Sequence, residues 1–205
     1  MLNAILALTL FSSTATRTAS TPASGVTKVV IIARAGSLDV KGENGVTEIR
    51  AKGEAEASSD DVLKKMQLVA TRSGSTVTIE AQIPEDSSWI GSSPTLGFEV
   101  TEPAGMAVTI KDGSGSMTVK NIGELDITDG SGSIDIDGVT GNVRISDGSG
   151  GIEIEKVNGN VTITDDGSGM VDVKDVHGNF TVESKGSGQI TYDRISGRVS
   201  VPRKR

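Results

Sequence analysis

The stretch ISDGSGGIEIEKVNGNVTITDDGSGMVDVK, residues 145–174, contains the motif Asp-Gly-Ser-Gly twice. Apolar residues alternate with polar ones between the two copies. Glycine-rich loops can bind phosphate, and Asp-Gly runs can hold calcium. A third interpretation is that the motif is only a corner of the chain, repeated because the architecture itself repeats.

The spacing of the glycines favours the third interpretation. From Asp112 onward the chain divides into units of about nine residues, each with an early glycine followed by an x-apolar-x-apolar-x pattern. This alternation indicates a strand with one buried face. Odd units begin with a Gly-Ser-Gly corner, whereas even units carry an aliphatic residue in the corner. The complete repeat is therefore about 18 residues long, with two strands and two corners.

A regular repeat of this length predicts an all-β fold, a parallel β-solenoid with two short strands in each coil. Each strand would pair in parallel with its equivalent in the next coil, about 4.8 Å away. The residues predicted to point inward are apolar or aromatic in every coil. They are Met117, Val119, Ile122, Leu125, Ile127, Ile134, Ile136, Val139, Val143, Ile145, Ile152, Ile154, Val157, Val161, Ile163, Val171, Val173, Val176, Phe180, Val182, Ile190, Tyr192, Ile195, Val199 and Val201.

We expect the solenoid repeats to occupy residues 101–201, after an irregular, β-rich N-terminal cap with the first strands at residues 27–100. Within the cap, Ser59 followed by two aspartates predicts the start of one short helix. The stretch MQLVATRSGSTVTIEAQI predicts a hairpin with its turn around Arg72–Ser75. Residues 84–97, PEDSSWIGSSPTLG, are expected to form a loop. The cap would cover the edge strand of the first coil.

The two ends of the chain differ from the rest in composition. Residues 1–15 are typical of a signal peptide, with cleavage after Ala15, and residues 16–26 would then be a linker. The apolar stretch is too short to span a bilayer as a stable helix, so no membrane span is expected. Residues 202–205 form a basic tail. We therefore expect a secreted, periplasmic or cell-surface protein.

Composition excludes several classes of function. The chain of 205 residues has no cysteine, which rules out disulfides, thiolate metal sites and cysteine nucleophiles. Its net charge of −7 argues against nucleic acid as a partner. The single histidine, His177, offers no Ser/His/Asp arrangement, and the carboxylates lie in open ladders rather than in a partly dry pocket. We expect no enzyme activity and no cofactor; a glycan-cleaving solenoid enzyme is the less favoured alternative.

The segment FEVTEPAGMAVTIK and the repeats after it resemble a bacterial family of unknown function labelled "putative adhesin" and described as β-strand-repeat-containing. The resemblance rests on Pro103–Gly105 and on the serial Gly-Ser-Gly corners, and it extends from about Thr27 to Val201. The corner glycines are Gly113, Gly130, Gly148, Gly167 and Gly186. It implies an exported or envelope-associated β-solenoid, and it supplies no catalytic residue to transfer.

The aspartates that open the odd corners are candidate calcium ligands, because carboxylates are hard oxygen donors. These residues are Asp112, Asp129, Asp147 and Asp166. In the nonapeptide calcium repeat, however, the ligand lies at the sixth position, which is apolar here. Lys185 occupies the aspartate position in the last coil. We therefore expect no metal and interpret Asp-Gly as turn chemistry. Phosphate binding is also disfavoured, because the corners lead into strands and not into helices.

The outward-facing residues suggest weaker candidates for ligand binding. Odd strands present an acidic face and even strands a hydroxyl-rich one, on which Thr162 and Thr164 form a Thr-x-Thr pair. The candidates on the acidic face are Asp135, Glu153 and Asp172. Trp89, the only tryptophan, either stacks on a sugar or fills the core of the cap. Asn142, Asn160 and Asn179 recur at the even corners and predict a hydrogen-bonded ladder.

These observations predict an exported, non-enzymatic β-solenoid that acts as a cell-envelope interaction or adhesin-like protein. The alternatives are a cation- or glycan-binding module and an envelope-stress signalling component. The partner would be an envelope protein or polysaccharide. At the C-terminal end, Pro202 cannot donate a ladder hydrogen bond and three basic residues follow it. We interpret this tail as a gatekeeper that keeps the protein monomeric; the competing interpretation is a basic anchor for anionic envelope polymers or lipids.

Overall fold

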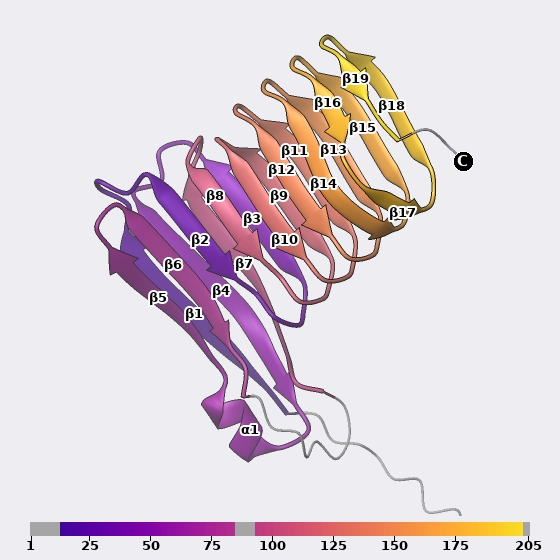
Figure 1. Cartoon of the computed structure of the whole chain (residues 1–205). Helices are drawn as coiled ribbons and strands as arrows, with labels where there is room; N and C mark the ends of the chain where they lie inside the picture. The colour runs from indigo at the N-terminus through magenta and orange to yellow at the C-terminus, as the bar shows by residue number, and fades with distance from the viewer. Residues whose placement is uncertain (1–12, 85–92, 203–205) are drawn as a thin grey trace, which may run out of the picture.

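The computed structural model describes residues 13–84 and 93–202, which form two large, mostly parallel β-sheets that face each other across a common core (Figure 1). Sheet A contains, in spatial order, β1 (Ser13–Pro22), β4 (Glu48–Ala57), β7 (Thr95–Pro103), β3 (Leu38–Glu43), β9 (Met117–Ile122), β11 (Ile134–Val139), β13 (Ile152–Val157), β15 (Val171–Val176) and β18 (Ile190–Ile195).

Sheet B contains, in spatial order, β19 (Val199–Ser200), β16 (Phe180–Val182), β14 (Val161–Ser168), β12 (Val143–Asp147), β10 (Leu125–Asp129), β8 (Ala107–Lys111), β2 (Lys28–Ile32), β6 (Thr76–Gln82) and β5 (Gln67–Ser73). The short strand β17 (Lys185–Ser187) pairs with β14. One helix, α1 (Asp60–Lys65), lies at the end of the molecule formed by β1, β4 and β5 (Figure 1).

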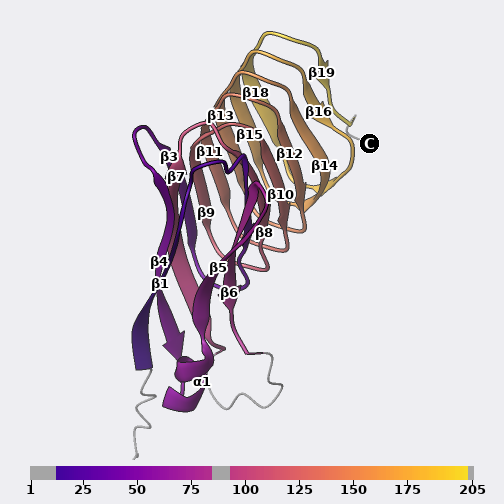
Figure 2. The same ribbon diagram turned by 90° about the vertical axis from the view of Figure 1, so that its left-hand side faces the viewer.

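From β9 onward the chain alternates between the two sheets, and each strand pairs in parallel with its equivalent in the next repeat (Figure 2). Ile134, for example, pairs with Ile152, which pairs in turn with Val171. The expected parallel pairing at a spacing of about 18 residues is therefore confirmed for these strands. Each side chain lies next to the side chain at the same position of the neighbouring repeat.

The predicted inward residues are buried in the first four repeats. Each has 4% or less of its surface exposed. The last repeat differs, because Ile190, Ile195, Val199 and Val201 are half-buried and Tyr192 is 48% exposed. No described strand lies beyond β18 and β19 to cover them. The burial expected for this repeat is therefore wrong, although the Tyr192 ring still lies 5.9 Å from that of Phe180.

The Gly-Ser-Gly corners stack as closely as the strands do. Gly132 and Gly150 have φ values of 139° and 143°, which only glycine adopts readily. A Cβ atom added to Gly150 would lie 1.5 Å from the carbonyl oxygen of Gly132. The motif is thus required by backbone geometry, which supports its interpretation as a corner.

Two predictions for the cap are confirmed. The helix begins after Ser59, whose side chain accepts a hydrogen bond of 3.3 Å from the amide of Val62. Acidic residues in its first turn and lysines in its last complement the helix dipole. Strands β5 and β6 form the expected antiparallel hairpin, and Gly74 in the turn has a φ of 60°.

Two boundaries of the cap need correction. The expected linker, residues 16–26, lies mostly within β1, which pairs antiparallel with β4 along its whole length. The guanidinium of Arg17 fixes this strand by donating to the carbonyl oxygens of Met66 and Leu63, at 2.6 and 2.7 Å. The expected cleavage position after Ala15 falls inside the strand, and residues 1–12 of the expected signal peptide lie outside the described residues.

The second correction concerns the expected loop at residues 84–97. Strand β7 begins within it, at Thr95, because Leu96 and Phe98 supply the alternation that buries one face. Trp89 lies outside the described residues. Where the structure describes the chain, it contains no helix long and apolar enough to cross a membrane.

The register can be tested at adjacent positions of β13. Ile154 is fully buried, and its replacement by Asp places a carboxylate in the core. We expect Ile154→Asp to lower the free energy of unfolding by about 4 kcal/mol or more. Glu155→Gln, on the outer side of the same strand, should cost less than about 1 kcal/mol. Urea unfolding measures both; equal losses would show that the assigned faces are wrong.

Candidate functional site

The outer face of sheet A carries columns of polar side chains, because parallel pairing places equivalent residues side by side. One column contains Thr118, Asp135, Glu153, Asp172 and Thr191. The next contains Lys120, Asp137, Glu155, Lys174 and Asp193. The structure thus brings together the three acidic residues that the sequence singled out. We call these two columns the charged face.

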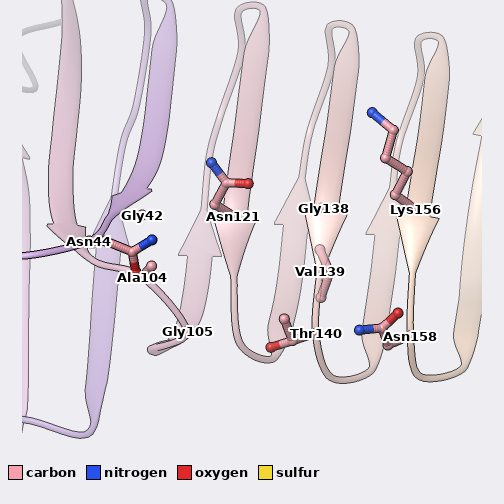
Figure 3. Close-up of a pocket in the computed structure, with 10 residues that line it drawn as sticks. All are labelled: Gly42, Asn44, Ala104, Gly105, Asn121, Gly138, Val139, Thr140, Lys156 and Asn158. Carbon is pink, nitrogen blue, oxygen red and sulfur yellow. The ribbon is translucent and has the colours of Figure 1, made fainter.

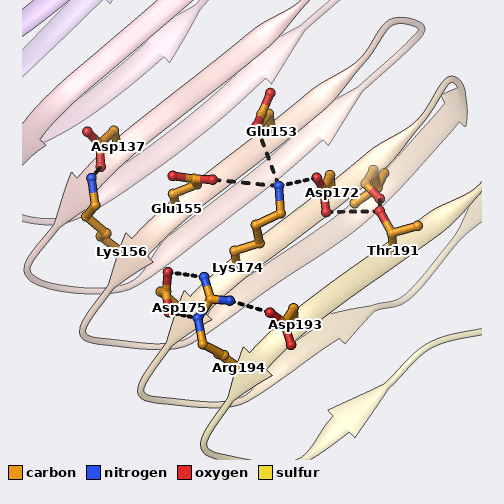
Figure 4. A network of polar contacts seen from close by, with 11 residues as sticks. Asp137, Glu153, Glu155, Lys156, Asp172, Lys174, Asp175, Thr191, Asp193 and Arg194 are labelled. Carbon is orange, nitrogen blue, oxygen red and sulfur yellow. Dashed lines mark hydrogen bonds and ion pairs between the residues drawn. The ribbon is translucent and has the colours of Figure 1, made fainter.

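Lys174 lies at the centre of the charged face (Figure 4). Its ammonium is 2.6 Å from Asp172, 3.7 Å from Glu155 and 3.8 Å from Glu153. The hydrogen bond from Lys174 lowers the pKa of Asp172, and the same bond raises the pKa of the lysine. Exposed pairs of this kind add little stability, so their main effect is to fix a pattern of charge on the surface.

A third charged column lies near the C-terminal ends of the sheet A strands β13, β15 and β18. The sequence analysis did not identify it. Lys156, Asp175 and Arg194 occupy one position of successive repeats, and each has a φ between 52° and 58°. Arg194 forms ion pairs with Asp175 and Asp193, and Lys156 lies 2.8 Å from Asp137 (Figure 4). Charges that alternate in sign at a spacing of 19 residues are the sequence signal for this column.

A hollow of about 440 Å³ lies beside this column, at the corners between the sheets (Figure 3). Amide and hydroxyl groups from several repeats line it, among them those of Asn44, Asn121, Thr140 and Asn158. No aromatic side chain is among its lining residues. Donors and acceptors of this kind match the hydroxyl groups of a saccharide.

The two members of the Thr-x-Thr pair on sheet B have different surroundings. Thr162 pairs with Thr181 of the next repeat and remains part of the surface. The register shifts after Ile145, however, because Ser146 pairs with Asp165 and Thr164 is left without a partner on β12, which makes a bulge. The Thr164 hydroxyl donates to the carbonyl oxygen of Ile145 at 3.0 Å.

The four corner aspartates are buried inside the fold. Asp129 follows Leu125 and Ile127 on the inward face of β10, and 5% of its surface is exposed. The others, Asp112, Asp147 and Asp166, are exposed by 9%, 2% and 0%. Pairing places Asp129, Asp147 and Asp166 in register with Lys185, whose ammonium contacts Asp166. We call the four aspartates, Asp112, Asp129, Asp147 and Asp166, the aspartate column.

Few partners compensate for this burial. Asp112 accepts a hydrogen bond of 2.7 Å from the amide of Gly113, and Asp147 accepts one of 3.2 Å from Ser149. Both carboxyl oxygens of Asp129 are buried without a hydrogen-bond partner. Burial raises the pKa of Asp112 and of Asp147 to about 6, and it raises the pKa of Asp129 as well.

The aspartate column does not have the arrangement of a metal site. Over the described residues, no group of three or more histidine or carboxylate side chains could hold a metal ion. Besides the turn chemistry predicted for these aspartates, the sequence contains a signal that places them inside. They continue the i, i+2, i+4 alternation of the apolar residues before them, so strand geometry sends them to the core.

Glu102 is a further buried carboxyl that the sequence analysis missed. It continues the inward alternation of Phe98 and Val100 on β7 and is fully buried. Neither carboxyl oxygen has a hydrogen-bond partner. Burial raises the pKa of Glu102 to about 8, so the side chain is neutral at pH 7.

Glu102 should make stability depend on pH. Between its ordinary pKa of 4.5 and about 8, the folded state holds a proton that the unfolded state has released. The free energy of unfolding therefore falls as pH rises through this window, by on the order of 5 kcal/mol in all. We expect Glu102→Gln to match the wild type near pH 4.5 and to exceed it near pH 8. Melting curves for the two proteins that stay parallel across this range would contradict the prediction.

The asparagine ladder predicted for the even corners is confirmed by its hydrogen bonds. The Asn142 side-chain oxygen accepts from the amide and the side chain of Asn160, at 2.9 and 3.1 Å. Asn160 accepts in turn from the amide of Asn179 at 2.8 Å, and Asn179 accepts from Arg198 at 2.8 Å. Each asparagine links one repeat to the next.

Removing one rung of this ladder should weaken the stack. Asn160→Ala leaves the amide of Asn179 without its acceptor, so we expect a loss of about 1–2 kcal/mol in the free energy of unfolding. Asn158→Ala, an exposed position in the same corner, is the matched control and should cost less than about 0.5 kcal/mol. Denaturant titration compares them, and similar losses would argue against the ladder.

Comparison with known proteins yields similarity of structure only. No family model matches the chain, and no curated protein matches it in sequence. A Clostridium sporogenes protein described as a "putative cell adhesion protein" aligns with 93% of this chain and 100% of its own, at 13% identity and a TM-score of 0.41. A Bacteroides fragilis "putative adhesin" aligns with 91% of this chain and 96% of its own, at 14% and 0.41.

A third similar structure, from Parabacteroides distasonis, is described as a "putative lipid binding protein". It aligns with 92% of this chain and 97% of its own, at 13% identity and a TM-score of 0.37. At such values the function of this chain has to be argued from its own residues.

Proposed function

We propose that this protein is an exported, non-enzymatic parallel β-solenoid that acts as a cell-envelope interaction or adhesin-like protein. It would be secreted, periplasmic or located at the cell surface. The observation that carries the proposal is the charged face, where Lys174 and the acidic residues around it repeat from strand to strand. The partner is an envelope polysaccharide or protein.

The rigidity of the charged face supports a binding role. Its side chains project from β11, β13 and β15, whose inward residues are fully buried. A surface fixed by such a core loses little conformational entropy when a partner binds. Charges repeated at the strand spacing of about 4.8 Å suit an extended partner that itself carries charged groups along its length.

The positions of the perturbed carboxyls also favour binding over catalysis. Glu102, Asp112 and Asp147, whose pKa values are raised by burial, are absent from the linings of four hollows on the described surface. On the charged face, the pKa of Asp172 is lowered by Lys174. General-acid chemistry needs the opposite, a carboxyl with a raised pKa that a substrate can reach.

Glycan binding in the hollow of Figure 3 is a second candidate function. The amides of Asn121 and Asn158 and the hydroxyl of Thr140 support it, because they offer hydrogen bonds to a saccharide.

For the C-terminal tail, we propose that the basic residues after Pro202 act as a gatekeeper and keep the protein monomeric.

Binding of the full-length chain to purified cell-wall polysaccharide, measured by calorimetry, tests both candidates. If the charged face binds, Asp135→Asn/Glu153→Gln/Asp172→Asn should change the affinity by about tenfold, and added salt should weaken binding. Asn158→Ala should then have no effect, as should Thr162→Ser on the opposite sheet. Loss of binding with Asn158→Ala alone would favour the hollow. Unchanged affinity in all three variants would contradict both candidates for this ligand.

A further inference from the structure

The aspartate column places like charges where water does not separate them. Asp129, Asp147 and Asp166 are direct partners in the parallel pairing of β10, β12 and β14. Asp112 extends the column by one repeat, since Lys111 pairs with Thr128. Strands in such a sheet lie about 4.8 Å apart, so each carboxyl has another as its neighbour. At this separation, each buried carboxyl that ionises makes the ionisation of its neighbour less favourable.

The described groups around the column supply a single buried cation. The residue before Asp112 in register is Ala33, and the residue after Asp166 is Lys185. The strands that follow the corners begin with buried apolar residues, namely Met117, Ile134, Ile152 and Val171. Three charged residues near the same edge, Arg34, Asp165 and Glu183, are exposed. Lys185 balances Asp166, which leaves three buried carboxyls without a counter-charge.

We propose that the aspartate column is a pH-sensitive element, in which shared protons hold neighbouring repeats together in mild acid and ionisation loosens them at higher pH. A protonated carboxyl donates a hydrogen bond to the next one, so a partly protonated column links the repeats along the Gly-Ser-Gly corners. When the protons leave, the same neighbours repel each other. The repulsion falls on Asp112, Asp129 and Asp147, because Lys185 already neutralises Asp166.

The direction of the pH effect on stability follows from whether the folded or the unfolded state binds more protons. In the unfolded chain these aspartates ionise near 3.8, whereas burial raises the pKa of Asp112 and Asp147 to about 6 in the folded state. Between these values the folded state binds more protons than the unfolded state does. Stability therefore falls as pH rises through this window, and the loss is complete above about 6.

Thermal unfolding and hydrogen exchange of the full-length chain, from about pH 4 to about pH 8, test the proposal. In the wild type, the corner amides of Gly132 and Gly150 should exchange faster at high pH than the intrinsic exchange rate accounts for. In Asp129→Asn/Asp147→Asn, the fall in melting temperature across this range should shrink, leaving the part that Glu102 and Asp112 contribute. Asp135→Asn/Glu153→Gln, the matched control on the charged face, should keep the wild-type fall.

Two more measurements keep the test decisive. Lys185→Met leaves Asp166 without its counter-charge, so the fall in melting temperature should become steeper than in the wild type. If the double variant does not fold, the single variant Asp129→Asn should still reduce the fall. Equal falls in the wild type and the foldable column variant would overturn the proposal. It would also fail if millimolar calcium, added above pH 7, restored the melting temperature seen in acid, because the column would then be a metal site.

Discussion

Backbone contact between equivalent residues of successive repeats is the constraint on which the rest of the structure depends. It applies to the corners as well as to the strands. At Gly132, an added Cβ would lie 1.7 Å from the carbonyl oxygen of Gly115, and at Gly169 it would lie 1.6 Å from that of Gly150. Only glycine allows the corners to approach as closely as the strands. Each turn of the chain therefore brings a residue next to the equivalent residue of the previous repeat.

This constraint places every side chain beside its own equivalent, which has different consequences for different residue types. Apolar residues gain a continuous core, and asparagines gain a ladder because an amide is both donor and acceptor. Charged residues gain only if their sign alternates, as in Lys156, Asp175 and Arg194. The aspartate column is buried, and its signs do not alternate until Lys185. Protons are the remaining way to reduce its repulsion.

The two ends of the stack differ in how their inward-facing residues are covered. At the N-terminal end, the edge strands β1 and β5 lie against each other and close the core. Arg17 strengthens this closure through the carbonyl oxygens at the end of α1. At the C-terminal end, β18 and β19 are the outermost described strands, and Tyr192 remains partly exposed. An inward-facing residue is buried only if another layer covers it, so the same sequence pattern gives two outcomes.

The sequence by itself determined the two-strand repeat, the identity of the corners and the inward face of each repeat. It did so because the side-chain period of a strand and the need for glycine at a tight approach are local properties. The same alternation also pointed Asp129 and Glu102 inward, but turn chemistry offered an equally local explanation for the aspartates. Only the tertiary structure showed that no partner accompanies these carboxyls into the core. It also decided that β1 joins sheet A and that Thr164 lies at a bulge. Pairing with a distant strand and a bulge set by the neighbouring repeat are not encoded in a short stretch of sequence.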